Sequence, residues 1–193
     1  MNQLVDMLAS RRSVKVKKLA EPAPDASQLE KILQIGMRVP DHGKLAPWRI
    51  KVFDTSAQAA FGDLCAKRFS ELHEDAREKQ IEHERRRPQR APLLLAVMFE
   101  PVIGRIPLWE QQLSMGAVCM NILHAAHAMG FAGQWLSEWI AYDEVICAAL
   151  AESNEAEIAG FIYIGTATEV PDDRTRPDID TIVSNWAPAP AKP

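Results

Sequence analysis

Two groups of arginines, one near each end of the chain, have the residue types and spacing to bind a phosphate. Arg11, Arg12 and Ser13 follow a short helical pattern, and Arg174 and Arg176 follow the last predicted strand. Guanidinium groups bind phosphate oxygens through paired hydrogen bonds, and a hydroxyl adds a donor. Each group also has a simpler explanation. Basic residues at a helix end complement its dipole, and the later pair could lie in a solvated loop.

Two further segments could contact a planar, polar ligand. Arg38 and His42 flank a turn restricted by proline, which can present their donors together; the alternative is an ordinary helix cap followed by a turn. Gly133 permits close approach of the backbone, and Trp135 could flank an aromatic ring; the alternative is a core strand.

The sequence lacks the motifs of a serine nucleophile, a Walker loop, a zinc protease or a dinucleotide-binding turn. His124 and His127 lie three residues apart and could hold a metal, but no third ligand is near them in sequence. Solvent-facing or interface histidines are the simpler interpretation. We therefore predict no metal site and no catalytic side-chain nucleophile.

Composition predicts one globular domain over residues 1–186, followed by an Ala/Pro-rich tail at 187–193. The net charge of −4 argues against a nucleic-acid or membrane partner, and the apolar runs are too short to span a bilayer. The charged run 67–90 is interpreted as a solvated helix rather than a nucleic-acid patch, because no aromatic residues are interleaved in it. Three cysteines, widely spaced and odd in number, predict a reducing, cytoplasmic location.

Helices and strands that position these residues can be placed from apolar spacing and caps. Ser27 and Glu30 fit a capping box, and Pro40 stops the helix that they begin. We predict helices at 4–10, 27–39, 56–87, 109–130 and 143–150, and strands at 48–53, 92–99, 131–137 and 158–165. The strand at 92–99 is continuously apolar, which predicts burial on both faces. This order favours a sheet covered by helices, of the α+β or α/β class.

The helix at 109–130 has almost no polar face, so it should lie in the middle of the fold or at a subunit interface.

Together, these motifs resemble the FMN-dependent nitroreductase family, and within it the compact YdjA-like NAD(P)H nitroreductases. The resemblance extends from Arg11 to about Ile182. The matching motifs are Arg11-Arg12-Ser13, Gly36-Met37-Arg38-Val39-Pro40-Asp41-His42 with Pro47-Trp48, Arg90-Ala91-Pro92-Leu93, Trp109-Glu110-Gln111 and Gly160-Phe161-Ile162-Tyr163-Ile164-Gly165-Thr166.

The resemblance implies an α+β, nitroreductase-like fold with a mainly antiparallel sheet flanked by helices. It also implies an intertwined homodimer with FMN at the subunit interface, whose core and cofactor floor would be formed by the apolar helix at 115–129. Ten residues are implied to bind the flavin. At its phosphate end these are Arg11, Arg12 and Ser13, with Arg174 and Arg176 as a looser match; from the partner subunit, Arg38 and His42; along the ring, Trp135, Leu136 and Ser137.

The implied activity is ping-pong hydride transfer through flavin N5, from NAD(P)H to a nitroaromatic, quinone or enone acceptor. Lys15 is a candidate to balance negative charge on the reduced ring. Leu136 stands where the similar subgroup carries arginine, so a polar contact there is absent. The alternative function is a flavin carrier or redox sensor without efficient turnover.

Overall fold

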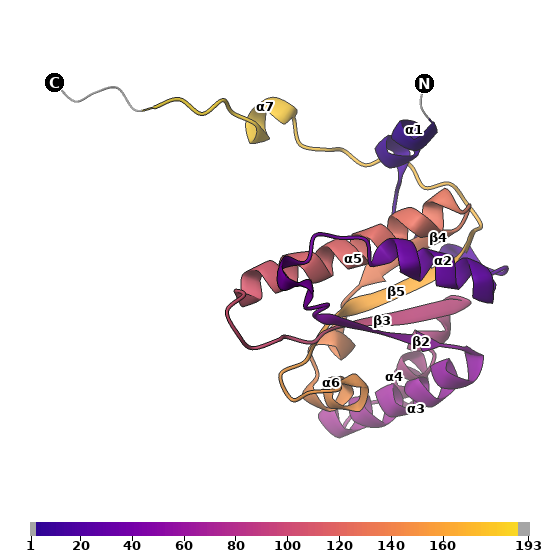
Figure 1. Ribbon diagram of the computed structural model, residues 1–193. Helices are drawn as coiled ribbons and strands as arrows, with labels where there is room; N and C mark the ends of the chain where they lie inside the picture. Colours follow the sequence, from indigo (N-terminus) through magenta and orange to yellow (C-terminus); the bar gives the residue numbers. More distant parts are fainter. Residues whose placement is uncertain (1–2, 189–193) are drawn as a thin grey trace.

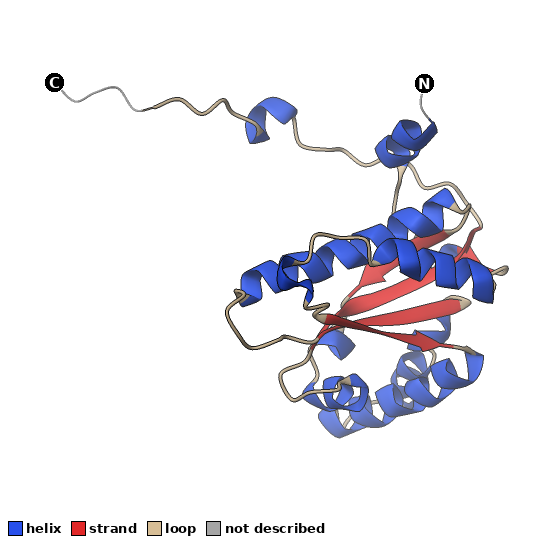
Figure 2. Cartoon of the chain, in the orientation of Figure 1, coloured by secondary structure: helices blue, strands red, loops and turns tan. Residues whose placement is uncertain are grey.

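The computed structural model describes residues 3–188, and its body is a sheet between two layers of helices (Figure 1). Helices α2 and α5 cover one face, and α3, α4 and α6 cover the other (Figure 2). The helices are α1 (Gln3–Ser10), α2 (Ala26–Gly36), α3 (Thr55–Leu72), α4 (Glu78–Arg85), α5 (Leu108–Ala128), α6 (Glu144–Leu150) and α7 (Ile179–Ile182). The strands are β1 (Leu19–Ala20), β2 (Trp48–Phe53), β3 (Leu93–Phe99), β4 (Ala132–Leu136) and β5 (Glu157–Ala167).

Every strand pairing in the described sheet is antiparallel. The longest strand, β5, pairs with β3, β4 and β1, while β2 pairs with the outer side of β3. This arrangement confirms the α+β class and the mainly antiparallel sheet. The short strand β1 was not expected from the sequence.

Strand β3 divides the hydrophobic core in two. Leu94, Ala96 and Met98 pack toward α3 and α6, whereas alternate residues such as Leu95 and Val97 pack toward α2 and α5. All seven residues of β3 are buried. Because successive side chains of a strand point to opposite faces, a central strand covered by helices on both sides must be apolar throughout. The prediction of a strand buried on both faces is confirmed.

The start of α2 differs from the predicted capping box. Asp25, not Ser27, is the N-cap: its carboxylate accepts from the Gln28 backbone N–H at 2.8 Å. The Gln28 side-chain carbonyl in turn accepts from the Asp25 backbone N–H at 3.0 Å. Both pairs fit the same sequence pattern, and the carboxylate at 25 begins the helix two residues earlier.

The predicted single helix over 56–87 is wrong, because the chain turns back after Leu72. His73 ends α3, the turn at 74–77 follows, and α4 returns along α3 before a 3-10 turn at Arg87–Arg90. Gly62 allows the close approach: a Cβ there would lie 2.1 Å from the Arg85 carbonyl oxygen. A charged sequence is compatible with one long helix, but packing of α4 on α3 selects two.

Both ends of the described chain project from the body (Figure 1). Helix α1 extends from the α5 side, and the segment after β5 runs past it and carries α7, a helix not predicted from this charged sequence. Apolar side chains on this segment, including Ile179, Ile182 and Trp186, are exposed. The predicted tail at 187–193 lies mostly outside the described residues. No helix within 3–188 has the length and apolar character needed to cross a bilayer.

Candidate functional site

The segment after α1 is attached to the edge strand β4. The Val14 N–H donates to the Gly133 carbonyl at 3.2 Å, and the Val16 N–H donates to the Gln134 side-chain carbonyl at 2.8 Å. Val14 and Val16 are buried, so the intervening Lys15 side chain is directed outward. These bonds place the first group of predicted phosphate-binding residues, Arg11 to Ser13, beside the strand that leads to Trp135.

The two arginine groups, more than 160 residues apart in sequence, converge on one surface cavity. The cavity has a volume of about 360 Å³, and its lining includes Arg11, Arg12, Ser13, Arg174 and Arg176. The Arg12 guanidinium donates to the Asp172 carbonyl, which holds the C-terminal segment against this region. The structure thus brings together all five residues predicted at the phosphate end.

Arg11 is electrostatically uncompensated. Its Nη1 is buried and has no hydrogen-bond partner among the described residues. Burial, followed by repulsion from Arg176 and Arg12, lowers the pKa of Arg11 below its ordinary value. A buried guanidinium nitrogen without a hydrogen-bond partner is unfavourable unless an anion binds it. The cavity therefore has the donors and the charge of an anion site.

His124 and His127 lie on α5 close to the same arginines. Burial and the charge of Arg11 lower the pKa of both imidazoles. The His127 Nδ1 is 3.2 Å from the Leu123 carbonyl oxygen. Within residues 3–188 no group of three His, Cys, Asp or Glu side chains is placed to hold a metal ion. Burial and the neighbouring cation both disfavour protonation, so the neutral form of these histidines is favoured.

Trp135, Leu136 and Ser137 form the end of β4 and the first residue beyond it. The Trp135 indole N–H donates to the Ala159 carbonyl at 3.1 Å. Gly160 leaves room for the ring, because a Cβ there would lie 2.2 Å from the indole nitrogen. Leu136 packs against the core on the α3 side, and its side chain offers no hydrogen bond. Trp135 is thus held by a hydrogen bond and is still 37% exposed.

A polar cluster directly behind this segment was missed in the sequence. Glu138 forms ion pairs with Arg87, at 2.6 Å, and with Arg90. Arg87 also forms two hydrogen bonds with Glu84, at 2.5 and 2.7 Å. The prediction that the whole charged run is a solvated face is therefore wrong at Arg87 and Glu84, whose side chains are 10% and 7% exposed. The only sequence signal was the three-residue spacing of Glu84 and Arg87, which is common on exposed helices.

Arg38 and His42 lie elsewhere in the same chain. His42 Nδ1 is 2.7 Å from a carboxylate oxygen of Glu110, in the first turn of α5. The Asn121 side chain donates to the Arg38 carbonyl at 3.0 Å. Glu110 and His127 are about 25 Å apart along a straight helix. Within one chain, His42 is therefore not brought to the arginine cavity.

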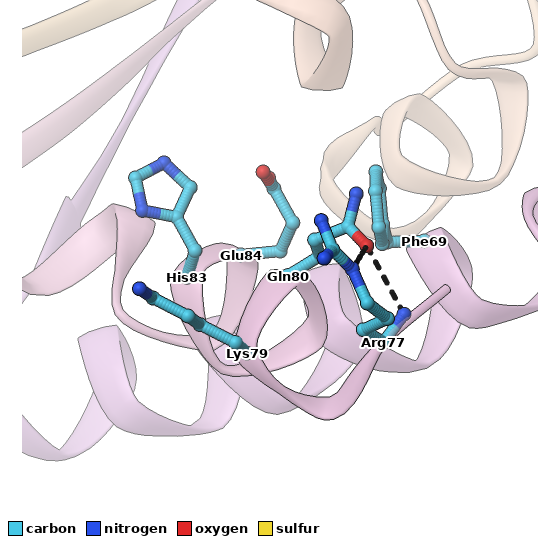
Figure 3. A pocket seen from close by; sticks show the side chains of 6 residues that line it. All are labelled: Phe69, Arg77, Lys79, Gln80, His83 and Glu84. Atoms are coloured by element: carbon cyan, nitrogen blue, oxygen red, sulfur yellow. Dashed lines mark hydrogen bonds between the residues drawn. The ribbon is translucent and has the colours of Figure 1, made fainter. Parts of the chain in front are cut away.

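A second surface cavity, of about 500 Å³, lies at α4, on the other side of the sheet. Figure 3 shows its lining: Phe69 from α3, and Arg77, Lys79, Gln80, His83 and Glu84 from α4 or its N-cap. The Gln80 carbonyl oxygen accepts from the backbone and the side chain of Arg77, at 3.1 and 3.2 Å. None of the residues predicted to bind the ligand lines this cavity.

Comparisons with known proteins agree on one family. The profile described as "Nitroreductase family" matches residues 8–166. The chain is 35% identical over 163 residues to "Putative NAD(P)H nitroreductase YdjA" of Escherichia coli, which covers 84% of this chain and 87% of that protein. It is 32% identical over 166 residues to a Haemophilus influenzae protein with the same functional name, covering 84% and 88%.

Solved structures show the same fold. A nitroreductase-like family protein from Bacillus cereus superposes with a TM-score of 0.82 at 19% identity, covering 96% of this chain and 97% of that one. A nitroreductase with bound FMN from Bacteroides fragilis superposes with a TM-score of 0.69 at 17% identity, covering 97% and 100%. At these identities the likeness concerns the arrangement of the chain.

Proposed function

Because the chain belongs to the nitroreductase family, we propose that it binds FMN and transfers electrons from NAD(P)H to a small-molecule acceptor. The observation that carries the proposal is the arginine cavity. It contains a buried, unpaired Arg11 nitrogen and four further predicted donors, beside the strand that leads to Trp135. Nitroaromatic, quinone and enone compounds are the acceptor classes to test.

The phosphate of FMN would occupy the arginine cavity. Its charge near −2 would supply the partner that Arg11 lacks and would reduce the repulsion of Arg11 by Arg176 and Arg12. Arg12 is already bonded to the Asp172 carbonyl, so it is held in place before the ligand arrives. Ser13 and Arg174 complete the set of donors.

The flavin ring would lie along residues 135–137. When bound, the flavin supplies the hydride chemistry, so no protein nucleophile is needed. The chain's own residues 135–137 would hold the ring from one side. Lys15 is exposed and lies two residues after Ser13 in the segment bonded to β4, where its ammonium group would balance negative charge on the reduced ring.

A second copy of the chain would complete the site. One face of α5 remains uncovered: Trp109 and Leu113 are exposed, Gly116 faces open space, and Met120 is half-buried. These positions recur every three or four residues, so they form one apolar stripe on the helix. Packing of two such stripes would form a homodimer. Arg38 and His42 of one subunit would then approach the flavin of the other.

The test is reconstitution followed by turnover. The purified protein is expected to be yellow, or to become yellow when FMN is added, and to oxidise NADH or NADPH when an acceptor is supplied. Protein that does not bind FMN contradicts the proposal. Under anaerobic conditions, one of the two nicotinamides should bleach the bound flavin. Flavin that neither of them bleaches would instead support a carrier or sensor.

A further inference from the structure

Glu138 has a backbone conformation that ordinary residues avoid. Its φ is +55° and its ψ is −179°. This region is accessible to glycine, but the Cβ of any other residue makes it unfavourable. Glu138 directly follows Ser137, the last residue of the proposed ring-binding segment. A strained residue at this place persists only if other interactions hold it there.

The interactions that hold it come from the carboxylate. Arg87 Nη1 donates to one carboxylate oxygen at 2.6 Å, and Arg90 Nη1 donates to the same oxygen at 3.0 Å. Arg90 Nη2 donates to the other oxygen. The side chain is 23% exposed, so these bonds form largely out of solvent. A carboxylate bound by two guanidinium groups has little freedom to turn.

The two arginines are themselves fixed. Glu84 binds Arg87 from the opposite side through both carboxylate oxygens, at 2.5 and 2.7 Å. The Tyr163 hydroxyl accepts from Arg90 at 3.1 Å and donates to the Arg87 carbonyl at 3.2 Å. Tyr163 is fully buried on β5. Two carboxylates and two guanidinium groups balance in charge, so the cluster has no net charge.

The cluster also continues beyond Glu138. The Trp139 indole N–H donates to Glu84 at 2.8 Å, and Glu84 lines the cavity of Figure 3. Glu138 and the residue after it, Trp139, are thus both attached to one group of largely buried charges. The chain between Leu136, paired in the sheet, and Trp139 has little room to move.

We propose that Glu138 is a positioning residue, whose carboxylate, bound by Arg87 and Arg90, holds the strained turn that sets the shape of the ring-binding segment 135–137. The inference rests on the proposed function, because it assigns that segment to the flavin. In this role, the strained turn holds residues 135–137 in their binding conformation before the ligand arrives. Ordering it on binding would otherwise weaken the affinity.

Four variants separate this role from simple stabilisation. Glu138→Ala removes the carboxylate but keeps the unfavourable Cβ. Glu138→Gly removes the carboxylate and also the strain. Arg90→Gln removes the ion pair from the other side. Arg68→Gln is the matched control, because Arg68 pairs with Asp143 at 2.9 Å, has the same 23% exposure as Glu138, and joins α3 to α6 away from β4.

Each apoprotein is titrated with FMN by flavin fluorescence, its melting temperature is measured, and the visible circular dichroism of the bound flavin is recorded. Glu138→Ala is expected to weaken FMN binding about tenfold and to change the flavin dichroism. Without the ion pairs, alanine at this position should relax from the positive φ to an ordinary backbone conformation and displace the segment. Glu138→Gly should bind FMN more tightly than Glu138→Ala. Arg68→Gln should lower the melting temperature and leave the FMN Kd within about twofold of wild type.

Three results would overturn the inference. In the first, Glu138→Ala melts lower but has the FMN Kd and dichroism of wild type, so the cluster only stabilises the fold. In the second, Glu138→Gly binds no better than Glu138→Ala, so the strained backbone is irrelevant. If Glu138→Ala does not fold, Arg90→Gln decides, and an unchanged Kd and dichroism contradict the proposal. Wild-type protein that does not bind FMN overturns the proposed function as well.

Discussion

Replacing Arg11 with methionine should weaken FMN binding without weakening the apoprotein. In most proteins, removal of a half-buried arginine costs stability through lost ion pairs and packing. Arg11 is different, because its buried Nη1 has no partner and its neighbours Arg176 and Arg12 repel it. Methionine keeps the apolar length of the side chain and removes the unpaired charge.

The expected magnitudes have opposite signs. A hydrogen bond to a charged group contributes about 1.5–3 kcal/mol, so loss of one phosphate contact should raise the FMN Kd by roughly 10- to 150-fold. An unsatisfied buried donor costs about 1–3 kcal/mol before solvent screening. The partial exposure of Arg11 reduces that cost. We therefore expect the melting temperature of the apoprotein to stay constant or to rise slightly.

Riboflavin makes the assay specific for the phosphate, because it has the same ring without that group. Both ligands are titrated into apoprotein by quenching of flavin fluorescence, and thermal unfolding is followed without ligand. Arg11→Met should raise the Kd for FMN and leave the Kd for riboflavin within about twofold. Arg86→Met is the control, because Arg86 is the exposed C-cap residue of α4 and is paired with Glu82.

Two outcomes would refute the reasoning. Equal weakening of FMN and riboflavin would mean that Arg11 acts on the ring or on the fold rather than on the phosphate. A loss of apoprotein stability above about 1 kcal/mol would mean that the guanidinium group has a stabilising partner in solution.

Three further predictions concern the dimer and the buried charges. Arg11→Met and His42→Ala should each reduce turnover, but co-expressed subunits should regain activity, because one mixed site carries neither change; activity equal to that of the weaker variant would contradict a shared site. Met120→Asp should lower the sedimentation coefficient to that of a monomer, and a wild-type value would exclude α5 as the interface. Burial raises the pKa of Glu138, but the Arg90 hydrogen bonds and the Arg87 charge outweigh burial and hold that pKa below its ordinary value. The stabilisation by Glu138 is therefore complete above the ordinary pKa of glutamate and is lost as the pH falls through the folded-state pKa, so the melting temperature of Glu138→Gln should fall less in acid than that of wild type.

The sequence alone determined much of the architecture, because buried positions are apolar and recur with the period of the helix or strand that contains them. The continuous apolar run of β3 predicted a central strand, and its residues indeed pack into both cores. The nearly apolar α5 was predicted to be central or at an interface, and it packs on the sheet while leaving one stripe uncovered. Local periodicity was sufficient here because each side chain's environment follows from its position in one element.

Ambiguity remained wherever two local patterns were equally good. Asp25 with Gln28 and Ser27 with Glu30 both fit a capping box, and only the structure selects the first. The charged run 67–90 fits one exposed helix or two. The choice depends on Gly62, which admits the Arg85 backbone from the returning helix. Helical spacing alone predicts neither the choice of Asp25 as the cap nor the approach of Arg85 to Gly62.

The candidate site shows the same division. Residue type identified arginines suited to a phosphate, but only the tertiary structure decides that Arg11 and Arg176 share a cavity and that His42 does not join them within one chain. Glu138 carries no sequence signal, because its conformation and its pairing with Arg87 depend on a segment about fifty residues away. Periodicity shows which face of a helix or strand is buried. Charge pairing and backbone strain instead depend on which segments, distant in sequence, pack at that place in the fold.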